Sequence, residues 1–117
     1  ARDKDGERIA LPSLIRGLTS VPAQFVGLND RGLLSPGYKA DINLIDFEKL
    51  HLHAPQPVFD LPSGGRRLIQ PADGYVATFV SGVKTYQHGQ FSGALPGRLV
   101  RGPQQVDETA VARLVEA

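Results

Sequence analysis

The stretch LTSVPAQFVGLNDRGLLSPGYKADINLIDFEKL, residues 18–50, changes from helical to extended character within a few residues. Its first part predicts a short helix with Ser20 as the N-cap and Gly27 at the end. A turn is predicted at residues 35–37, because proline presets φ and glycine tolerates positive φ. The alternation that follows predicts a strand over residues 40–46. This stretch is therefore a junction between a helical part and a β part.

Upstream of the junction, apolar residues recur with helical spacing from about Pro12 onward, at Leu14, Ile15, Leu18 and Val21. Residues 1–8 are polar and predict a loop. The sequence thus predicts two consecutive helices that are not interleaved with strands.

Downstream, residues 54–73 predict a long irregular crossing that includes one short strand at 66–70. A β-hairpin is predicted next, with strands at 75–80 and 83–87 joined by a turn at Ser81 and Gly82. Asp107 is the predicted N-cap of a C-terminal amphipathic helix. A crossing of nearly twenty residues argues against a self-contained compact fold.

Composition excludes several classes of protein. The chain has 117 residues, of which 41% are hydrophobic, and a net charge of +1. This balance argues against disorder and provides no electrostatic surface for nucleic acid or an anionic membrane. No apolar run approaches the ~20 residues of a membrane span, and nothing at the start resembles a signal peptide. We expect a cytoplasmic protein. Because the chain starts at Ala1 and contains no methionine, we also expect it to be a piece of a longer one.

His51 and His53 form the strongest candidate for a metal-binding motif. Alternate residues of a strand share a face, so two imidazoles could bind one zinc ion. A catalytic zinc site usually has at least three protein ligands, and His88 is the only other histidine. The interpretation favoured here is a strand exit before the proline-rich stretch.

The other polar motifs have ordinary structural explanations. The segment SGGRR at 63–67 predicts turn chemistry, because no helix follows that could complete a phosphate loop. No serine lies in a G-x-S-x-G elbow, and Thr19 is expected to cap or back-bond at a helix end. Asp41 and Asp46 have opposite strand parity, so these carboxylates and Asp30 are expected to accept hydrogen bonds from turn backbone.

Residues 18–50 resemble the C-terminal junction of the amidohydrolase superfamily, in which T-x-x-P-A is followed by G-L, D-R-G-x-L-x-P-G and A-D. The matching positions are Thr19, Pro22, Ala23, Gly27, Leu28, Asp30, Arg31, Gly32, Leu34, Pro36, Gly37, Ala40, Asp41 and Asp46. Residues 60–102 resemble the closing segment of the D-aminoacylase (N-acyl-D-amino-acid deacylase) branch. That segment has a V-x-G hairpin and a T-G-x-x-P-G-R-x-x-R-G ending, with Ser92 replacing the threonine here.

The resemblance implies a mixed, mainly β chain. Residues 1–30 would be the last helices of a TIM-like barrel, residues 31–104 the C-terminal part of a composite β-sandwich, and residues 105–117 a short helix. The partners implied are the N-terminal barrel and sandwich strands, which are absent from this chain. An oligomer is left open, and no nucleic-acid or membrane partner is expected.

The resemblance also implies a hydrolase that cleaves a non-peptide C–N bond, the amide of an N-acyl-D-amino acid or a similar small molecule. Its zinc, one or two ions, would be held by barrel residues upstream. The family's His-x-His lies far before the junction, whereas His51 and His53 lie after it. No catalytic, cofactor-binding or metal residue is therefore assigned within this chain. The loop RDKDGER, residues 2–8, is expected to lie nearest to the absent site, and no role is assigned to its Arg2 or Asp3. The alternative is a stand-alone β domain that serves as a binding or assembly module.

Overall fold

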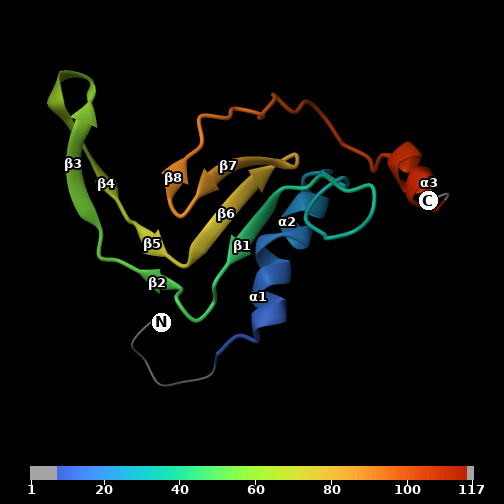
Figure 1. The fold of residues 1–117 in the computed structure, drawn as a ribbon, viewed down its shortest axis with the longest axis horizontal. Helices are drawn as coiled ribbons and strands as arrows, with labels where there is room; N and C mark the ends of the chain where they lie inside the picture. Colours follow the sequence, from blue (N-terminus) through green and yellow to red (C-terminus); the bar gives the residue numbers. More distant parts are fainter. Residues whose placement is uncertain (1–7, 116–117) are drawn as a thin grey trace. The chain divides into compact units, whose positions relative to one another are not determined.

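The computed structural model describes residues 8–115, which are mainly β with antiparallel pairing (Figure 1). The chain divides into two units, and each is described by itself. One unit contains the described residues up to Ala40 together with those from Arg98 onward, and the other is Asp41–Gly97. None of the helices in the described part of the chain has the length and apolar character needed to cross a bilayer.

Two short helices open the first unit, as the sequence predicts. α1 (Leu11–Leu18) has a proline in its first turn, and α2 (Ser20–Phe25) follows after a single residue, Thr19. The Thr19 hydroxyl donates to Ile15 O at 2.8 Å, which is the back-bonding expected at a helix end. The prediction that Ser20 is the N-cap is wrong, because Ser20 is the first helical residue and its side chain is buried.

α3 (Glu108–Val115) ends the described chain. The side chain of Asp107 accepts hydrogen bonds from the Thr109 backbone N–H at 3.0 Å and from the Thr109 hydroxyl at 2.6 Å. These bonds satisfy a donor that the first helical turn leaves without a partner, and they confirm Asp107 as the N-cap.

The second unit is built on a four-stranded antiparallel sheet in the order β1-β6-β7-β8. Its strands are β1 (Ile42–Ile45), β6 (Tyr75–Val80), β7 (Val83–Gln87) and β8 (Gln90–Phe91). The predicted hairpin is confirmed with its bounds unchanged. The predicted strand over 40–46 exists but is shorter, with an irregularity between Leu44 and Ile45.

Two tight turns close this sheet. Ser81 and Gly82 both have positive φ, and so do His88 and Gly89 at the next turn. Paired positive φ values match the right-handed twist of two antiparallel strands. The second turn sets β8 beside β7, where the Tyr86 and Phe91 rings lie 5.4 Å apart. The short strand β8 was not predicted, because two residues are too few to show alternation.

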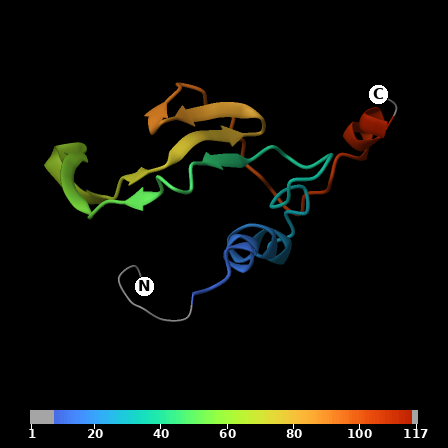
Figure 2. The ribbon, with the colours of Figure 1, turned by 60° about the horizontal axis from the view of Figure 1, so that its bottom comes forward.

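The predicted irregular crossing over 54–73 is largely wrong. Most of it is a hairpin made by β3 (Gln56–Leu61) and β4 (Gly65–Ile69), whose tip is a single 3₁₀ turn, η1 (Pro62–Gly64) (Figure 2). Pro57 is tolerated because β3 is paired on one side only. Ser63 and Gly64 have positive φ at the tip, which confirms turn chemistry for SGGRR.

A two-residue ladder joins this hairpin to the sheet. β2 (His51–Leu52) pairs with β5 (Ala72–Asp73), and the His53 backbone N–H donates to Pro71 O at 3.0 Å. His51 and His53 are therefore not the exit of the preceding strand, which ends at Ile45; they begin a separate pairing. The sequence signal was weak because each strand of the ladder has only two residues.

Few apolar side chains are enclosed. Ala23 and Ala77 are the buried hydrophobic residues in the described part of the chain. Large apolar side chains stay open to solvent on both units, among them Phe25 (89% exposed), Leu34 (86%) and Leu95 (86%). Contiguous exposed apolar surface on a folded chain marks places where other protein packs.

Candidate functional site

The junction loop, defined as residues 27–39, contains the most enclosed charge of the described chain. The side chain of Asp30 is only 6% exposed. Its two carboxylate oxygens accept hydrogen bonds from the Arg31 guanidinium at 2.9 and 3.2 Å. The Lys39 ammonium lies 3.4 Å from the same carboxylate, and the Lys39 backbone N–H donates to Asp30 O at 2.8 Å. Asp30 thus ties together the two ends of the loop.

The electrostatics of Asp30 follow from these partners. The hydrogen bond from the Arg31 side chain lowers the pKa of Asp30 most, and the charges of Arg31 and Lys39 lower it further. Partial burial acts in the opposite direction, because it disfavours the charged form. The net result is a pKa below the ordinary value of an aspartate. The carboxylate therefore stabilises the folded loop while it stays ionised.

This shift predicts a dependence of stability on pH. The stabilisation by Asp30 is fully present above the pKa of an aspartate in the unfolded chain, which is about 4. It is lost as the pH falls through the lower pKa of the folded state. As the pH falls from about 6 to 3, the free energy of unfolding of the parent should decrease. We expect a smaller decrease for Asp30→Asn over the same range. Urea unfolding at several pH values measures the free energy of unfolding of parent and variant. The same dependence of this free energy on pH in both proteins would contradict the prediction.

Gly32 holds the loop close to the helices. A Cβ atom on Gly32 would lie 3.0 Å from Ser20 Cα and from Thr19 O, and φ at this glycine is +87°. Only glycine combines this approach with this backbone conformation without strain. The D-R-G motif of the sequence is therefore a packing and ion-pair motif. Its aspartate forms ion pairs with basic side chains, and its glycine contacts the start of α2.

The histidine pair lies at the two-residue ladder. The rings of His51 and His53 are 4.9 Å apart and meet edge to face. His53 Nε2 lies 2.8 Å from Asp73 Oδ2, and the Gln70 amide donates to His53 O at 3.0 Å. Asp73 was not anticipated as a neighbour of His53, since it lies twenty residues later and only the ladder pairs them.

The described residues do not complete a catalytic metal site around this histidine pair. Among residues 8–115, no three His, Cys, Asp or Glu side chains form a group that could hold a metal ion. Zinc in a catalytic site needs three protein ligands and an open position. The His53–Asp73 contact is better explained as a cross-strand hydrogen bond that supports the ladder.

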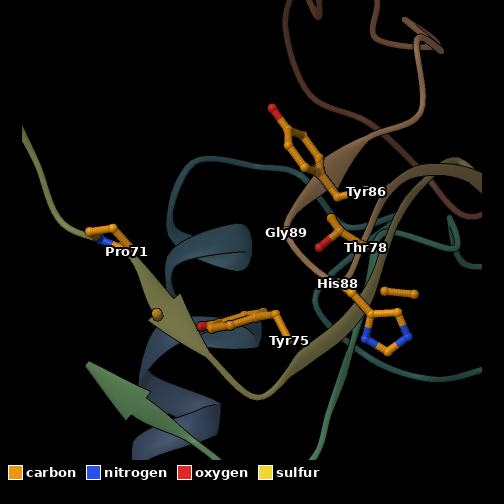
Figure 3. A pocket seen from close by; sticks show the side chains of 8 residues that line it. Pro71, Tyr75, Thr78, Tyr86, His88 and Gly89 are labelled. Carbon is orange, nitrogen blue, oxygen red and sulfur yellow. The ribbon is translucent and has the colours of Figure 1, made fainter. Parts of the chain in front are cut away.

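A hollow of about 510 Å³ lies at one end of the four-stranded sheet (Figure 3). Its lining comes from Pro71, Ala72, Tyr75, Ala77, Thr78, Tyr86, His88 and Gly89. His88 lies on the side of the hollow away from Pro71. The lining has one imidazole, two phenols and no carboxylate. No reaction is assigned to the hollow.

Asp41 and Asp46 have the structural roles expected of them. Asp41 Oδ1 accepts a hydrogen bond from Ser81 N at 2.8 Å and so holds the β6–β7 turn. Asp46 Oδ1 accepts from Lys49 N at 3.4 Å in the following turn. The expectation of backbone hydrogen bonding is confirmed for these two and is wrong for Asp30, which binds side-chain cations instead. Arg2 and Asp3 lie outside the described residues.

Ser92 shows how the closing motif works in this chain. The Ser92 hydroxyl donates to Lys84 O at 2.7 Å, and the Ala94 backbone N–H donates to Ser92 Oγ at 3.3 Å. A threonine hydroxyl could make the same two bonds. The replacement of threonine by serine is therefore mild at this position.

Comparison with known proteins shows to which family these motifs belong. Residues 1–91 match the sequence profile described as the amidohydrolase family. The chain belongs to the amidohydrolase family. The match includes the junction loop, the histidine ladder and the β6–β7 hairpin of this amidohydrolase chain, and it ends at the short strand β8.

Curated relatives agree with this membership. The amidohydrolase chain is 49% identical over 49 residues to a 5-methylthioadenosine/S-adenosylhomocysteine deaminase of Pelotomaculum thermopropionicum; the match covers 40% of this chain and 11% of the relative. It is 37% identical over 62 residues to a deaminase of the same name from Desulfitobacterium hafniense strain DCB-2, covering 43% of this chain and 14% of the relative. These matches thus span less than a sixth of each relative. No solved structure matches the chain significantly.

Proposed function

We propose that this amidohydrolase chain is the C-terminal part of a metal-dependent hydrolase that cleaves a non-peptide C–N bond of a small molecule. The family match over residues 1–91 carries this proposal. The curated relatives support it, since a deaminase also acts on a C–N bond and since the matches cover only 11% and 14% of those proteins. A cytoplasmic location stays a prediction.

Within that enzyme, the chain serves as structure. Residues 1–30 are the final helical segment of the barrel, residues 31–104 the C-terminal share of the sandwich, and residues 105–117 a terminal helix. The open apolar side chains support this role, because Leu14, Ile15 and Leu18 of α1 are each at least 42% exposed. Those side chains are where the barrel strands pack. The outer edge of β1 accepts a strand from the N-terminal part of the sandwich.

The alternative of a stand-alone β module has less support. A domain of this size normally encloses an apolar core, whereas the described part of this chain buries only two alanines among its hydrophobic residues. A well-dispersed amide NMR spectrum and a cooperative unfolding transition of the isolated 117 residues would favour the module over the enzyme part.

Two substrate classes follow from two observations. The closing segment, residues 60–102, resembles the D-aminoacylase branch and favours the amide of an N-acyl-D-amino acid. The identities to proteins named deaminases favour an exocyclic amino group, as on 5-methylthioadenosine. We place the N-acyl-D-amino acid first, because the branch motif runs through to Gly102, past the end of the family match.

The metal, proposed to be zinc, belongs to the barrel. In an amidohydrolase it lowers the pKa of a bound water so that a hydroxide is available near neutral pH. The described residues provide no site for it, so no step of the reaction is assigned to this chain.

The proposal is tested on the complete gene product. Purified protein is assayed for release of acid from N-acyl-D-amino acids and of ammonia from 5-methylthioadenosine, before and after treatment with a chelator. We expect turnover of one class, lost on chelation and restored by Zn²⁺. No turnover of either class, or turnover that resists chelation, would contradict a metal-dependent C–N hydrolase.

A further inference from the structure

The C-terminal segment lies against the junction loop. Gln104 and Leu28 form a parallel β-bridge: Gln104 N donates to Gly27 O at 2.9 Å, and Asn29 N donates to Gln104 O at 3.1 Å. Two segments more than seventy residues apart in the sequence thus share backbone hydrogen bonds. Within the unit that contains both, the loop is not a free connection.

Two glycines of the loop provide the contact surface. At Gly37, a Cβ atom would lie 2.5 Å from Val111 Cγ2 and 2.8 Å from Val106 Cγ1, so the two valines occupy the space that a side chain would take. At Gly27, the corresponding Cβ would make an ordinary 3.5 Å contact with Pro103 Cβ. The loop is therefore shaped to receive the C-terminal segment.

The same loop contacts α2 on its other side. Gly32 approaches Ser20, and the buried carboxylate of Asp30 joins the two ends of the loop. Gly27, Gly32 and Gly37 are spaced by five residues, and the outer two face the C-terminal segment whereas the middle one faces the helix. The order of the loop thus depends on two contacts, one with α2 and one with the C-terminal segment. Only the contact with α2 lies within the family match.

We propose that residues 103–115 form a clamp on the junction loop, and that release of this clamp opens the loop and exposes its Asp30 ion pairs to solvent. Three backbone hydrogen bonds, the third from Asp107 N to Gly37 O at 3.4 Å, and two valines make a small contact. Opening is therefore a local event that does not require global unfolding. The clamp lies beyond residue 91, where the family match ends, and its role does not depend on which reaction the enzyme catalyses.

Hydrogen exchange of the complete gene product tests the clamp. The reporters are the amides of Asn29, bonded to Gln104 O, and Lys39, bonded to Asp30 O. Gly37→Ala places a methyl group against Val106 and Val111, and we expect both amides to exchange on the order of tenfold faster. Gly89→Ala is the matched control, because Gly89 has a similar positive φ of 75° and nothing within 4 Å of its Cβ position.

A second variant removes the clamp without altering the loop. Deletion of residues 103–117 should accelerate exchange at Lys39 to a similar extent, and a synthetic peptide of residues 98–117 added in excess should restore protection. The amide of His88, bonded to Val76 O in the other unit, should not change in Gly37→Ala or in the deletion variant. Unchanged exchange at Lys39 after deletion, or equal acceleration by Gly37→Ala and Gly89→Ala, would overturn the proposal.

Discussion

Replacing Asp30 by asparagine is expected to lower the free energy of unfolding of the unit that contains the junction loop by about 2–3 kcal/mol. The substitution keeps the shape of the side chain but removes the charge that binds Arg31 and Lys39. The two cations stay partly exposed, Arg31 to 20% and Lys39 to 41%, so the loss is mainly that of their charge-assisted contacts with the enclosed carboxylate. Urea-induced unfolding, followed by far-UV circular dichroism of the complete gene product, measures the effect.

Asp60→Asn is the matched control for this prediction. Asp60 also accepts two hydrogen bonds from one arginine, Arg67, in the β3–β4 hairpin. Its side chain is 50% exposed, compared with 6% for Asp30. Solvent screening limits such an exposed pair to below about 1 kcal/mol. Equal effects of the two substitutions would show that burial does not set the contribution of the Asp30 pair.

The second large effect is expected from Gly74→Ala. Gly74 has φ +91° and connects β5 to β6, and its carbonyl accepts the Asp46 backbone N–H at 2.8 Å. A Cβ atom there would lie 2.7 Å from Leu50 Cα and 2.9 Å from Asp46 O, both backbone atoms that cannot rotate away. The left-handed conformation costs about 1–2 kcal/mol for a residue with a side chain, and the overlap adds about 1–3 kcal/mol.

Gly93→Ala separates these two costs. Gly93 has φ +87° and nothing within 4 Å of its Cβ position, so it carries only the conformational cost. We expect a loss of about 1–2 kcal/mol for Gly93→Ala and of about 2–5 kcal/mol for Gly74→Ala in thermal unfolding of the complete gene product. Similar melting temperatures for the two variants would contradict the close backbone approach at Gly74.

The fold could be predicted where its signal is local. The sequence predicted the helix N-cap at Asp107 because a capping residue is a local feature. It predicted the β6–β7 hairpin because a β-branched run with a Ser-Gly turn is also local. The β3–β4 hairpin was missed because its prolines suggested coil, although a strand paired on one side tolerates proline. The β2–β5 ladder and the C-terminal contact with the junction loop depend on residues far apart in sequence, which no local pattern identifies.

The candidate sites, too, could be predicted only where their signal is local. The sequence placed Asp30 and Gly32 in the D-R-G motif but gave the wrong partner for Asp30, since Lys39 reaches it only through the fold of the loop. The order of the motifs in the chain predicts that the histidine pair is separate from the family's metal motif, and this stays a prediction. Its contact with Asp73 could not be foreseen, because the strand that positions Asp73 has two residues.

The most direct test of the central claim, that this chain is a structural part of an amidohydrolase whose metal is bound elsewhere, is the metal content of the complete gene product with and without its histidine pair. Parent protein and the double variant His51→Ala, His53→Ala are purified in parallel and analysed by inductively coupled plasma mass spectrometry. We expect the same ratio of metal to protein in both, together with the same rate of C–N bond hydrolysis. Loss of bound metal from the double variant would contradict the claim and place the metal in this chain.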